Sequence, residues 1–384
     1  MLAATVRVTR DLDLAEEAVQ DAFVEALRVW PHDGVPDKPG AWLTTVAKRR
    51  ALNAMARAKT LDTKLPLLLE RDEDDLPDED FIGDDRLRLV FTCCHPALAR
   101  EAQLALTLRL VCGVATADVA HAFLISEATM AARITRAKKK IAAARIPYVV
   151  PEPHELPERL DAALTVIYLL YTTGHTAPAG DDLVRDELTA RALDLARMLH
   201  GLLPGGEAAG LLALLLCHEA RRGTRTDAHG RLLRMSEQNR TAWDRERIAE
   251  ADALIVAALR AGGRGRFLLQ AAIAALHAQA PSYEQTDWPQ ILELYDALLR
   301  VWPSPVVALN RAVALAEVEG PQAAIAAVDA LEGVDGYRYL HSTRADLLHR
   351  LGRDGEAADA YQRALQLTDN VAERTFLEER RAPR

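Results

Sequence analysis

Hydrophobic residues recur every three to four positions along most of the chain, which is the spacing of one face of an amphipathic helix. Residues 11–30 predict the first such helix, with an apolar stripe and an acidic stripe on different faces. The apolar stripe consists of Ala15, Val19, Ala22, Phe23, Ala26 and Trp30, and the acidic stripe of Asp13, Glu17, Asp21 and Glu25. Residues 31–39 hold three prolines and predict a loop, and residues 41–59 predict a second helix.

This helical pattern is interrupted at residues 60–85, where the abundance of aspartate predicts a linker. It resumes at residues 86–112, with Pro96 at or near a helix start. A helix-turn-helix pattern follows, with a short helix at residues 117–122, a turn, and a longer helix capped by Ser126. The longer helix carries the apolar stripe Met130, Ile134, Ala137 and Ile141 and the opposing polar stripe Thr129, Arg133, Arg136 and Lys140.

The last part of the chain predicts a separate helical domain. A proline-rich stretch at residues 146–157 predicts a hinge, and everything from residue 158 onward has helical spacing. Towards the end we expect two helix pairs, residues 305–317 with 322–331 and residues 337–351 with 355–367. The second pair has the spacing of a tetratricopeptide repeat at Ala345, Gly352, Ala357, Tyr361 and Ala364. The predicted class is all-α, with segments at residues 1–60, 61–85, 86–145, 146–157 and 158–384.

Composition excludes several classes of protein. Hydrophobic residues make up 49% of the 384 residues, so the chain can bury sizeable cores and is not a disordered protein. No apolar run approaches the roughly 20 residues of a membrane span, and nothing at the N-terminus resembles a signal peptide. The cysteines are too few and too scattered for a disulfide framework, so we expect a reduced, cytoplasmic setting without membrane association. They are Cys93, Cys94, Cys112 and Cys217.

Charge is distributed unevenly along the chain, and this changes the functional interpretation. The formal net charge is −9, of which residues 1–150 carry −1 and the remainder carries −8. Residues 42–64 and residues 126–145 each hold six cations and one acid, whereas residues 70–85 between them hold ten acids and one arginine. Two basic helices joined by an acidic linker therefore require a functional explanation.

The longer helix of the helix-turn-helix has the residue types that a DNA-recognition helix needs. These are a capped N-terminus, side chains that reach base edges, and cations that contact phosphates. The alternative is an ordinary helical hairpin with a solvated basic face. The candidate DNA-binding residues are Ser126, Glu127, Thr129, Arg133, Arg136, Lys139 and Lys140.

The basic helix at residues 41–59 combines an aromatic side chain with cations, which suits single-stranded DNA because bases stack and phosphates pair with cations. The alternative is a charged surface helix with Trp42 in the core. The candidate residues here are Trp42, Lys48, Arg49, Arg50, Asn53 and Arg57.

Catalytic and metal-binding chemistry find no support. The run Cys93-Cys94-His95 is a poor metal site, because consecutive side chains diverge and no second ligand pair follows at a zinc-site spacing. The sequence lacks a glycine-rich phosphate loop, Gly-x-Ser-x-Gly, His-Glu-x-x-His and a carboxylate pair in an apolar setting. We therefore expect no catalytic residue, metal or cofactor, and we interpret His175 and His218 as structural.

Several ordered segments together resemble the extracytoplasmic-function sigma factors. Residues 13–23 are similar to the helix of that family that binds core RNA polymerase, residues 41–57 to its promoter-melting and −10-reading helix, and residues 104–141 to its −35-reading helix-turn-helix. The subgroup with a long tetratricopeptide-like extension is indicated by Phe91-Thr92-Cys93-Cys94-His95-Pro96, Thr286-Asp287-Trp288 and the run from Pro303 to Ala312. Two arginines of the family pattern are replaced by Ala54 and Ala56, and the first helix is expected to be clipped.

This resemblance implies a sigma factor that recruits core RNA polymerase to promoters, with no catalysis of its own. It implies that the acidic helix contacts the polymerase through Asp13, Glu16, Glu17, Gln20, Asp21 and Phe23. The acidic C-terminal domain is expected to regulate, in one version by contacting the basic helices of the same chain. Two other functions stay open: a tetratricopeptide-type scaffold with degenerate sigma domains, and a one-component helix-turn-helix regulator. Neither requires polymerase binding.

Overall fold

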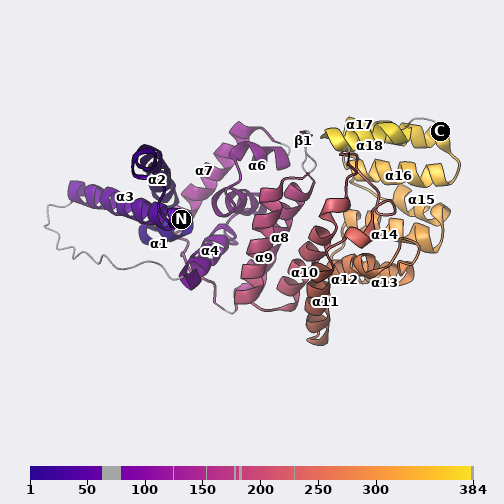
Figure 1. Ribbon diagram of the computed structural model, residues 1–384, viewed down its shortest axis with the longest axis horizontal. Coiled ribbons are helices and arrows are strands. Elements are labelled where there is room, and N and C mark those ends of the chain that lie inside the picture. Colours follow the sequence, from indigo (N-terminus) through magenta and orange to yellow (C-terminus); the bar gives the residue numbers. More distant parts are fainter. Residues whose placement is uncertain are drawn as a thin grey trace. The chain divides into compact units, whose positions relative to one another are not determined.

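Helices account for nearly all of the secondary structure, as the periodicity predicts, and the all-α class is confirmed (Figure 1). The computed structural model describes residues 1–62, 79–123, 125–152, 154–176, 179–180, 184–228 and 230–381. The chain forms two compact units, unit 1 at Met1–Val166 and unit 2 at Ile167–Arg384.

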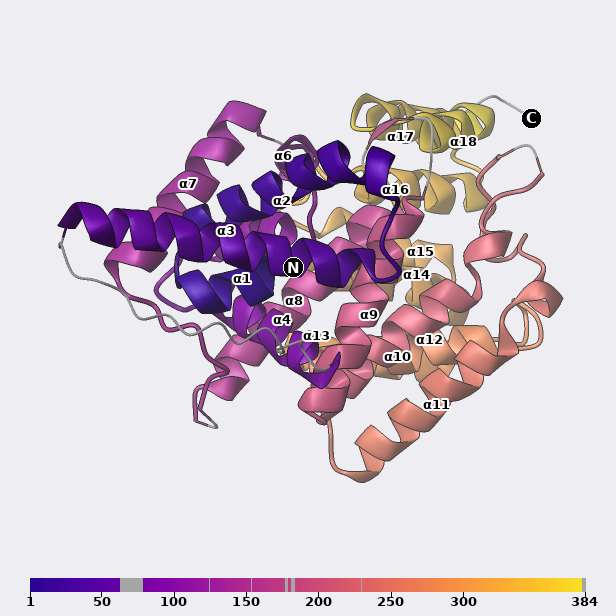
Figure 2. The ribbon, with the colours of Figure 1, turned by 60° about the vertical axis from the view of Figure 1, so that its left-hand side comes forward.

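Unit 1 begins with three helices that pack on one another, and α3 lies across α1 and α2 (Figure 2). They are α1 (Leu2–Thr9), α2 (Leu12–Asp33) and α3 (Pro39–Asp62). The Asp11 carboxylate caps α2, because Oδ1 accepts hydrogen bonds from the amides of Asp13 at 2.9 Å and Leu14 at 3.0 Å. α2 runs through Pro31 to Asp33, so the predicted loop is shorter than expected.

Small residues on α2 let α3 approach closely. Ala15, Ala22 and Ala26 of the predicted apolar stripe are buried, as is Ala18, and two further members of the stripe, Val19 and Trp30, pack against the same cluster half-buried. Phe23 is the exception: the prediction placed it in this stripe, but 48% of its surface is exposed. Helix geometry explains the difference, because Phe23 follows Ala22 by about 100° around the axis and so leaves the buried face.

The second half of unit 1 starts earlier than predicted. It contains α4 (Glu79–Cys93), α5 (Arg100–Leu106) with a π-helical turn (Thr107–Val111), α6 (Thr116–Ala122), α7 (Glu127–Ala143) and the first part of α8 (Leu156–His175). α4 begins inside the expected linker of residues 61–85, whose residues 63–78 lie outside the described chain. The acidic run was misleading because Asp85 is only 2% exposed and pairs with Arg7 at 3.6 Å and Arg88 at 3.5 Å.

The helix-turn-helix pattern is confirmed by α6 and α7. The Ser126 hydroxyl caps α7 by accepting a hydrogen bond from the Thr129 amide at 3.3 Å. The predicted apolar stripe of α7 is buried at Met130, Ile134, Ala137 and Ile141. Pro96 lies in the turn before α5 rather than in its first turn.

Residues 146–157 are not a hinge between the units but a part of unit 1. The Tyr148 hydroxyl lies 2.8 Å from the carbonyl oxygens of both Ala3 and Asp85. Further on, the Arg159 guanidinium donates to the carbonyl of Phe91 at 2.5 Å. The boundary between the units instead falls within α8, between Val166 and Ile167. Proline content alone was a poor guide, because the half-buried Tyr148 ties this segment to α1 and α4 through its hydroxyl group.

Unit 2 is a succession of antiparallel helix pairs with a short parallel strand pair, β1 (Ala179–Gly180) with β2 (Asp369–Asn370). Its helices are α9 (Asp186–Leu202), α10 (Gly206–Ala220), α11 (Arg245–Arg260), α12 (Arg266–Gln279), α13 (Trp288–Val301), α14 (Pro305–Val318), α15 (Pro321–Asp329), α16 (Arg338–Arg350), α17 (Asp354–Gln366) and α18 (Val371–Arg381). The last two predicted helix pairs are confirmed as α14 with α15 and α16 with α17. Ala345, Ala357, Tyr361 and Ala364 share one buried cluster there, as tetratricopeptide-type packing requires.

The centre of unit 2 is α10, which is buried on nearly all sides between α9, α11 and α12. Gly210 permits the closest approach, since a Cβ at this position would lie 2.4 Å from the amide nitrogen of Leu268 on α12. The Glu207 carboxylate on α10 accepts hydrogen bonds from the amides of Phe267 and Leu268, each at 3.2 Å, and so caps α12. No helix in the described part of the chain is long and apolar enough to cross a membrane.

Candidate polymerase and promoter interface

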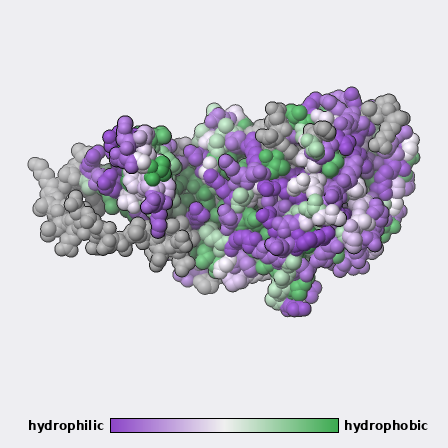
Figure 3. Space-filling view, viewed as in Figure 1, coloured by the Kyte–Doolittle hydropathy of each residue, from purple (hydrophilic) through white to green (hydrophobic). Residues whose placement is uncertain are grey.

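One face of α2 carries large apolar side chains that are exposed to solvent. Phe23 is 48% exposed, Val24 65% and Leu27 78%. The exposed polar side chains of Glu17, Gln20 and Asp21 lie on the same helix, one turn before them. We call these six residues the α2 surface; in Figure 3, hydrophobic and hydrophilic colouring lie side by side where Figure 1 shows α2. A helix that exposes large apolar side chains beside acids presents a surface suited to an apolar and basic partner.

The other acids of α2 are engaged within unit 1. Lys138 of α7 pairs with Asp13 at 3.0 Å and with Glu16, and Arg109 lies 3.7 Å from Glu16. Burial opposes the charged form of Lys138, but its hydrogen bonds to Glu16 and Asp13 dominate and raise its pKa. The predicted polymerase-binding set is thus divided: Asp13 and Glu16 contact α7, whereas Glu17, Gln20, Asp21 and Phe23 are exposed.

The fourth acid of the predicted stripe, Glu25, is also paired. Its carboxylate lies 2.6 Å from Arg28 and 3.2 Å from Arg50 of α3. The hydrogen bond from Arg28 lowers the pKa of Glu25. Among the acids of this stripe, Asp13 and Glu25 are paired with cations, whereas Glu17 and Asp21 are exposed and form no ion pair within the described chain.

On α3 the candidate −10 residues fall into two groups. The Trp42 ring packs against Trp30 with centroids 5.5 Å apart, beside a buried cluster that includes Leu43 and Val46. Trp42 is half-buried and packs against this cluster, which favours its alternative interpretation as a packing residue. Lys48 is half-buried, and the remaining candidates are exposed, namely Arg49, Arg50, Asn53 and Arg57.

On α7 the candidate −35 residues lie mostly on the solvent side. Ser126, Glu127, Thr129, Arg136, Lys139 and Lys140 are exposed. The Arg136 Nε donates to the Ala132 carbonyl at 3.2 Å, which directs the side chain along the helix. Arg133 is half-buried, with its guanidinium 5.9 Å from the centre of the Phe123 ring. Arg133 therefore has a packing role that the polar stripe did not predict.

The cysteines and their neighbours offer no reactive site. All four thiols are free and buried, and burial raises the pKa of Cys94 to about 11 and that of Cys217 to about 12. The His95 Nδ1 accepts the Ala97 amide at 3.1 Å. Among the described residues, no group of acids, histidines and cysteines is arranged to hold a metal ion.

Sequence reasoning missed several residues of this interface. Val24 and Leu27 follow Gln20 and Phe23 at helical spacing and lie off the buried alanine stripe, so the pattern contained a signal for them. Lys138 was set aside as one cation of a basic run. Its contact with α2 spans more than a hundred residues, and nothing in a single sequence indicates that pairing.

Parts of the chain match known protein families. Residues 2–60 match Sigma-70 region 2, residues 88–141 match Sigma-70 region 4, and residues 159–259 match a family of unknown function, DUF6596. An uncharacterized protein of Rhizobium meliloti (strain 1021), R00370, is 45% identical over 386 residues, covering 98% of this chain and 91% of the relative. A crystal structure of yeast Tom70 is similar at 14% identity with a TM-score of 0.38, covering 98% of this chain and 81% of that one.

The two sigma regions define a DNA-binding protein of transcription initiation, which works with core RNA polymerase on promoter DNA. Families of this class are regulators rather than enzymes. The chain belongs to the extracytoplasmic-function sigma factors that carry a helical C-terminal extension.

Proposed function

We propose that the α2 surface is the contact with core RNA polymerase, that α3 holds the opened −10 strand, and that α7 reads the −35 duplex. We further propose that unit 2 regulates this activity in cis. The exposure of Phe23, Val24 and Leu27 beside Glu17 and Asp21 carries the first assignment. Apolar side chains at a helix surface are commonly covered by a partner.

The charges favour a basic helical element of the polymerase as that partner. The acids on the outer face of α2 that are not engaged by cations of unit 1 are Glu17 and Asp21, which directly precede the apolar residues. Charge complementarity would steer the encounter, and the apolar side chains would supply the buried centre of the interface.

The two DNA contacts are assigned by exposure. On α3, Arg49, Asn53 and Arg57 offer cations and an amide to a single strand. On α7, Arg136, Lys139 and Lys140 offer cations to a duplex, and the capped N-terminus at Ser126 offers polar groups to base edges. The binding constant should fall as the salt concentration rises, and the steepness of this fall should be proportional to the number of phosphates that these cations neutralise.

The polymerase contact is tested by reversing its charges. Glu17→Lys with Asp21→Lys is compared with Glu187→Lys with Glu332→Lys, which changes the net charge equally at exposed positions of unit 2. We expect the first double variant to lose core binding by at least tenfold in a pull-down and to lose promoter-dependent transcription. The control pair should keep both. If core polymerase retains the two double variants equally, the α2 surface is not the contact with the polymerase.

Regulation by unit 2 is supported by charge, because residues 167–384 carry a formal net charge of −5 and are tethered to two basic helices. A chain that ends at Val166 tests it and is preferable to one that ends at Arg145, because Tyr148 and Arg159 hold unit 1 together. Loss of promoter-dependent transcription would make unit 2 an activator, and a gain would make it an inhibitor. Identical activity of the truncated and full chains at low and high salt would contradict a regulatory role.

A further inference from the structure

Unit 2 encloses a cavity of about 340 Å³ that the function in transcription leaves unexplained. Its size lies within the range of roughly 300–1,000 Å³ that small-molecule sites occupy. Aromatic side chains from Trp243 and Tyr295 form part of the wall, and Arg221, His218 and His277 supply polar groups. An apolar pocket with a few convergent polar groups is the usual form of a small-molecule site.

Arg221 is the distinctive residue of this cavity. Its guanidinium makes no hydrogen bond or ion pair within the described chain. Burial, together with the neighbouring Arg225, lowers its pKa to about 10, so it stays charged at neutral pH. Arg221 is half-buried and lines the cavity, and a partly desolvated cation without a carboxylate partner is retained most readily where a ligand supplies the missing charge.

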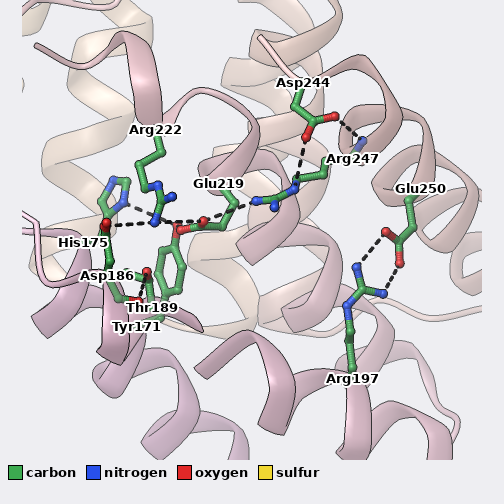
Figure 4. Close-up of polar contacts among 10 residues, drawn as sticks. All are labelled: Tyr171, His175, Asp186, Thr189, Arg197, Glu219, Arg222, Asp244, Arg247 and Glu250. Atoms are coloured by element: carbon green, nitrogen blue, oxygen red, sulfur yellow. Dashed lines mark hydrogen bonds and ion pairs between the residues drawn. The ribbon is translucent and has the colours of Figure 1, made fainter. Parts of the chain in front are cut away.

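The nearest carboxylate in the sequence is committed elsewhere. Glu219 accepts a hydrogen bond from the Tyr171 hydroxyl at 2.9 Å and pairs with Arg247 at 3.3 Å and Arg222 at 3.7 Å. Figure 4 shows these three groups converging on the Glu219 carboxylate. The Glu219 carboxylate thus already has three partners, and within the described chain no ion pair joins it to Arg221.

Two further arginines near the cavity are satisfied by the protein itself. Arg225 donates to the Thr176 hydroxyl at 3.0 Å and to the His175 carbonyl. Arg240 donates to the carbonyls of His277 at 2.7 Å and Ala280 at 2.8 Å. Their charges still contribute a positive potential at Arg221, which favours an anion over a cation or a neutral molecule.

The two histidines add unpartnered polar atoms. The Nδ1 atoms of His218 and His277 are buried without a hydrogen-bond partner. Burial is the main cause that lowers the pKa of His218 to about 3 and that of His277 to about 4. Both rings are therefore neutral at pH 7, and each has one N–H to donate. His218, which the sequence suggested was structural, thus also faces this cavity.

We propose that the cavity of unit 2 binds a small organic anion, with its oxyanion group on Arg221 and its apolar body against Trp243 and Tyr295. A carboxylate and a phosphate monoester share the chemistry that a guanidinium recognises through two parallel hydrogen bonds. This site goes beyond the function proposed above, because neither polymerase nor promoter binding requires it. It makes the extension a ligand-binding part of the protein.

The test uses the full chain and four probes at matched ionic strength: sodium phenylacetate, phenyl phosphate, inorganic phosphate and the neutral phenylacetamide. Thermal unfolding and tryptophan fluorescence are followed up to 10 mM of each probe. We expect a saturable rise in the melting temperature with phenylacetate or phenyl phosphate and none with phenylacetamide. The relative response to the two aromatic anions distinguishes a carboxylate site from a phosphate site. The absence of any response to the anions would overturn the proposal.

Variants at the cavity connect any response to Arg221. Arg221→Met should raise the melting temperature of the ligand-free protein, because it removes a half-buried cation that has no partner within the described chain, and should weaken anion binding at least tenfold. Arg221→Lys keeps the charge but loses the planar fork, so weaker binding with an unchanged fold is expected. Arg222→Met is the matched control, because this neighbouring arginine pairs with Asp186 and Glu219. An undiminished response of Arg221→Met, or an equal loss in Arg222→Met, would contradict the site.

Discussion

The Lys138 Nζ of α7 lies 3.0 Å from a carboxylate oxygen of Asp13 on α2, and the same ammonium pairs with Glu16. The helix of Sigma-70 region 4 that carries the basic face is therefore joined to the acidic helix of region 2. The Lys138 side chain is only 13% exposed, so the contact is shielded from solvent more than a surface ion pair is. Asp13 and Glu16, which were predicted to contact the polymerase, are therefore paired with Lys138 instead.

Replacing Lys138 by alanine should release those two acids. We expect Lys138→Ala to lower the stability of unit 1 by about 1–3 kcal/mol, because Glu16 is left half-buried with a weaker partner. At the same time core polymerase should bind several-fold more tightly, since α2 gains accessible negative charge. Lys139→Ala, at an exposed neighbouring position, is the control for lost DNA-binding charge. Urea unfolding measures the first effect and a polymerase-binding titration the second. An unchanged free energy of unfolding would show that the contact of Lys138 with α2 does not stabilise unit 1.

The two arginines of α7 should behave differently when truncated. Arg136→Ala should leave stability unchanged and weaken −35 duplex binding. Because one phosphate contact is lost, the slope of log binding constant against log salt concentration should become shallower by about 1. Arg133→Ala should also destabilise unit 1 by about 0.5–1 kcal/mol, because it removes the contact with the Phe123 ring. Binding titrations at several salt concentrations, with thermal unfolding alongside, distinguish the two. If neither variant changes DNA affinity, α7 is not the recognition helix.

Variants of Trp42 and Arg57 should distinguish the residues of α3 that pack within unit 1 from those that bind single-stranded DNA. Trp42→Ala should destabilise unit 1 by about 3 kcal/mol, because the ring packs against Trp30 and the apolar cluster beneath it. Arg57→Ala, at an exposed position, should leave the melting temperature within about 1 °C and weaken binding of a single-stranded −10 oligonucleotide. A stable Trp42→Ala protein that fails to bind the oligonucleotide would instead make Trp42 a direct DNA contact.

Local signals in the sequence predicted the helices well, and long-range pairing explains the errors. The capping side chains of Asp11 and Ser126 and the buried alanines of α2 follow rules that operate within one or two turns. Asp85 and Tyr148 follow no such rule. One appeared to be part of a solvated linker and the other part of a hinge, yet they contact each other across 63 residues. The environment of Arg221 was equally hidden, because its cavity is assembled from helices far apart in the chain.

Gly210 gives a test of the packing in unit 2. Gly210→Ala should destabilise the protein by about 2 kcal/mol or more, because the added methyl group would meet the backbone of Leu268 at 2.4 Å and α10 cannot move away. Gly201→Ala is the matched control: this helical glycine on α9 is exposed and has nothing within 4 Å of its added Cβ. There the same change should be neutral or stabilising by up to about 1 kcal/mol. Equal melting temperatures for the two variants would contradict the close approach of α10 and α12.

The buried histidines of the cavity should make unit 2 sensitive to mild acid. In the folded chain the pKa of His277 is lowered to about 4 and that of His218 to about 3, chiefly by burial, whereas in the unfolded chain both rings titrate near pH 6.5. Below pH 6.5 the unfolded chain therefore takes up protons that the folded chain does not, and stability falls as the pH falls. Each histidine contributes a slope of up to about 1.4 kcal/mol per pH unit down to its folded pKa.

Substitution isolates this contribution from the other acid-sensitive groups. His277→Gln should make the loss of stability between pH 6.5 and pH 4.5 shallower by up to about 1.4 kcal/mol per pH unit, because the glutamine does not titrate. Urea unfolding at several pH values, followed by tryptophan fluorescence, gives the slopes directly. Parallel curves for the parent protein and His277→Gln would mean that this ring takes up its proton in the folded chain, and that the cavity is wetter than its buried Nδ1 indicates.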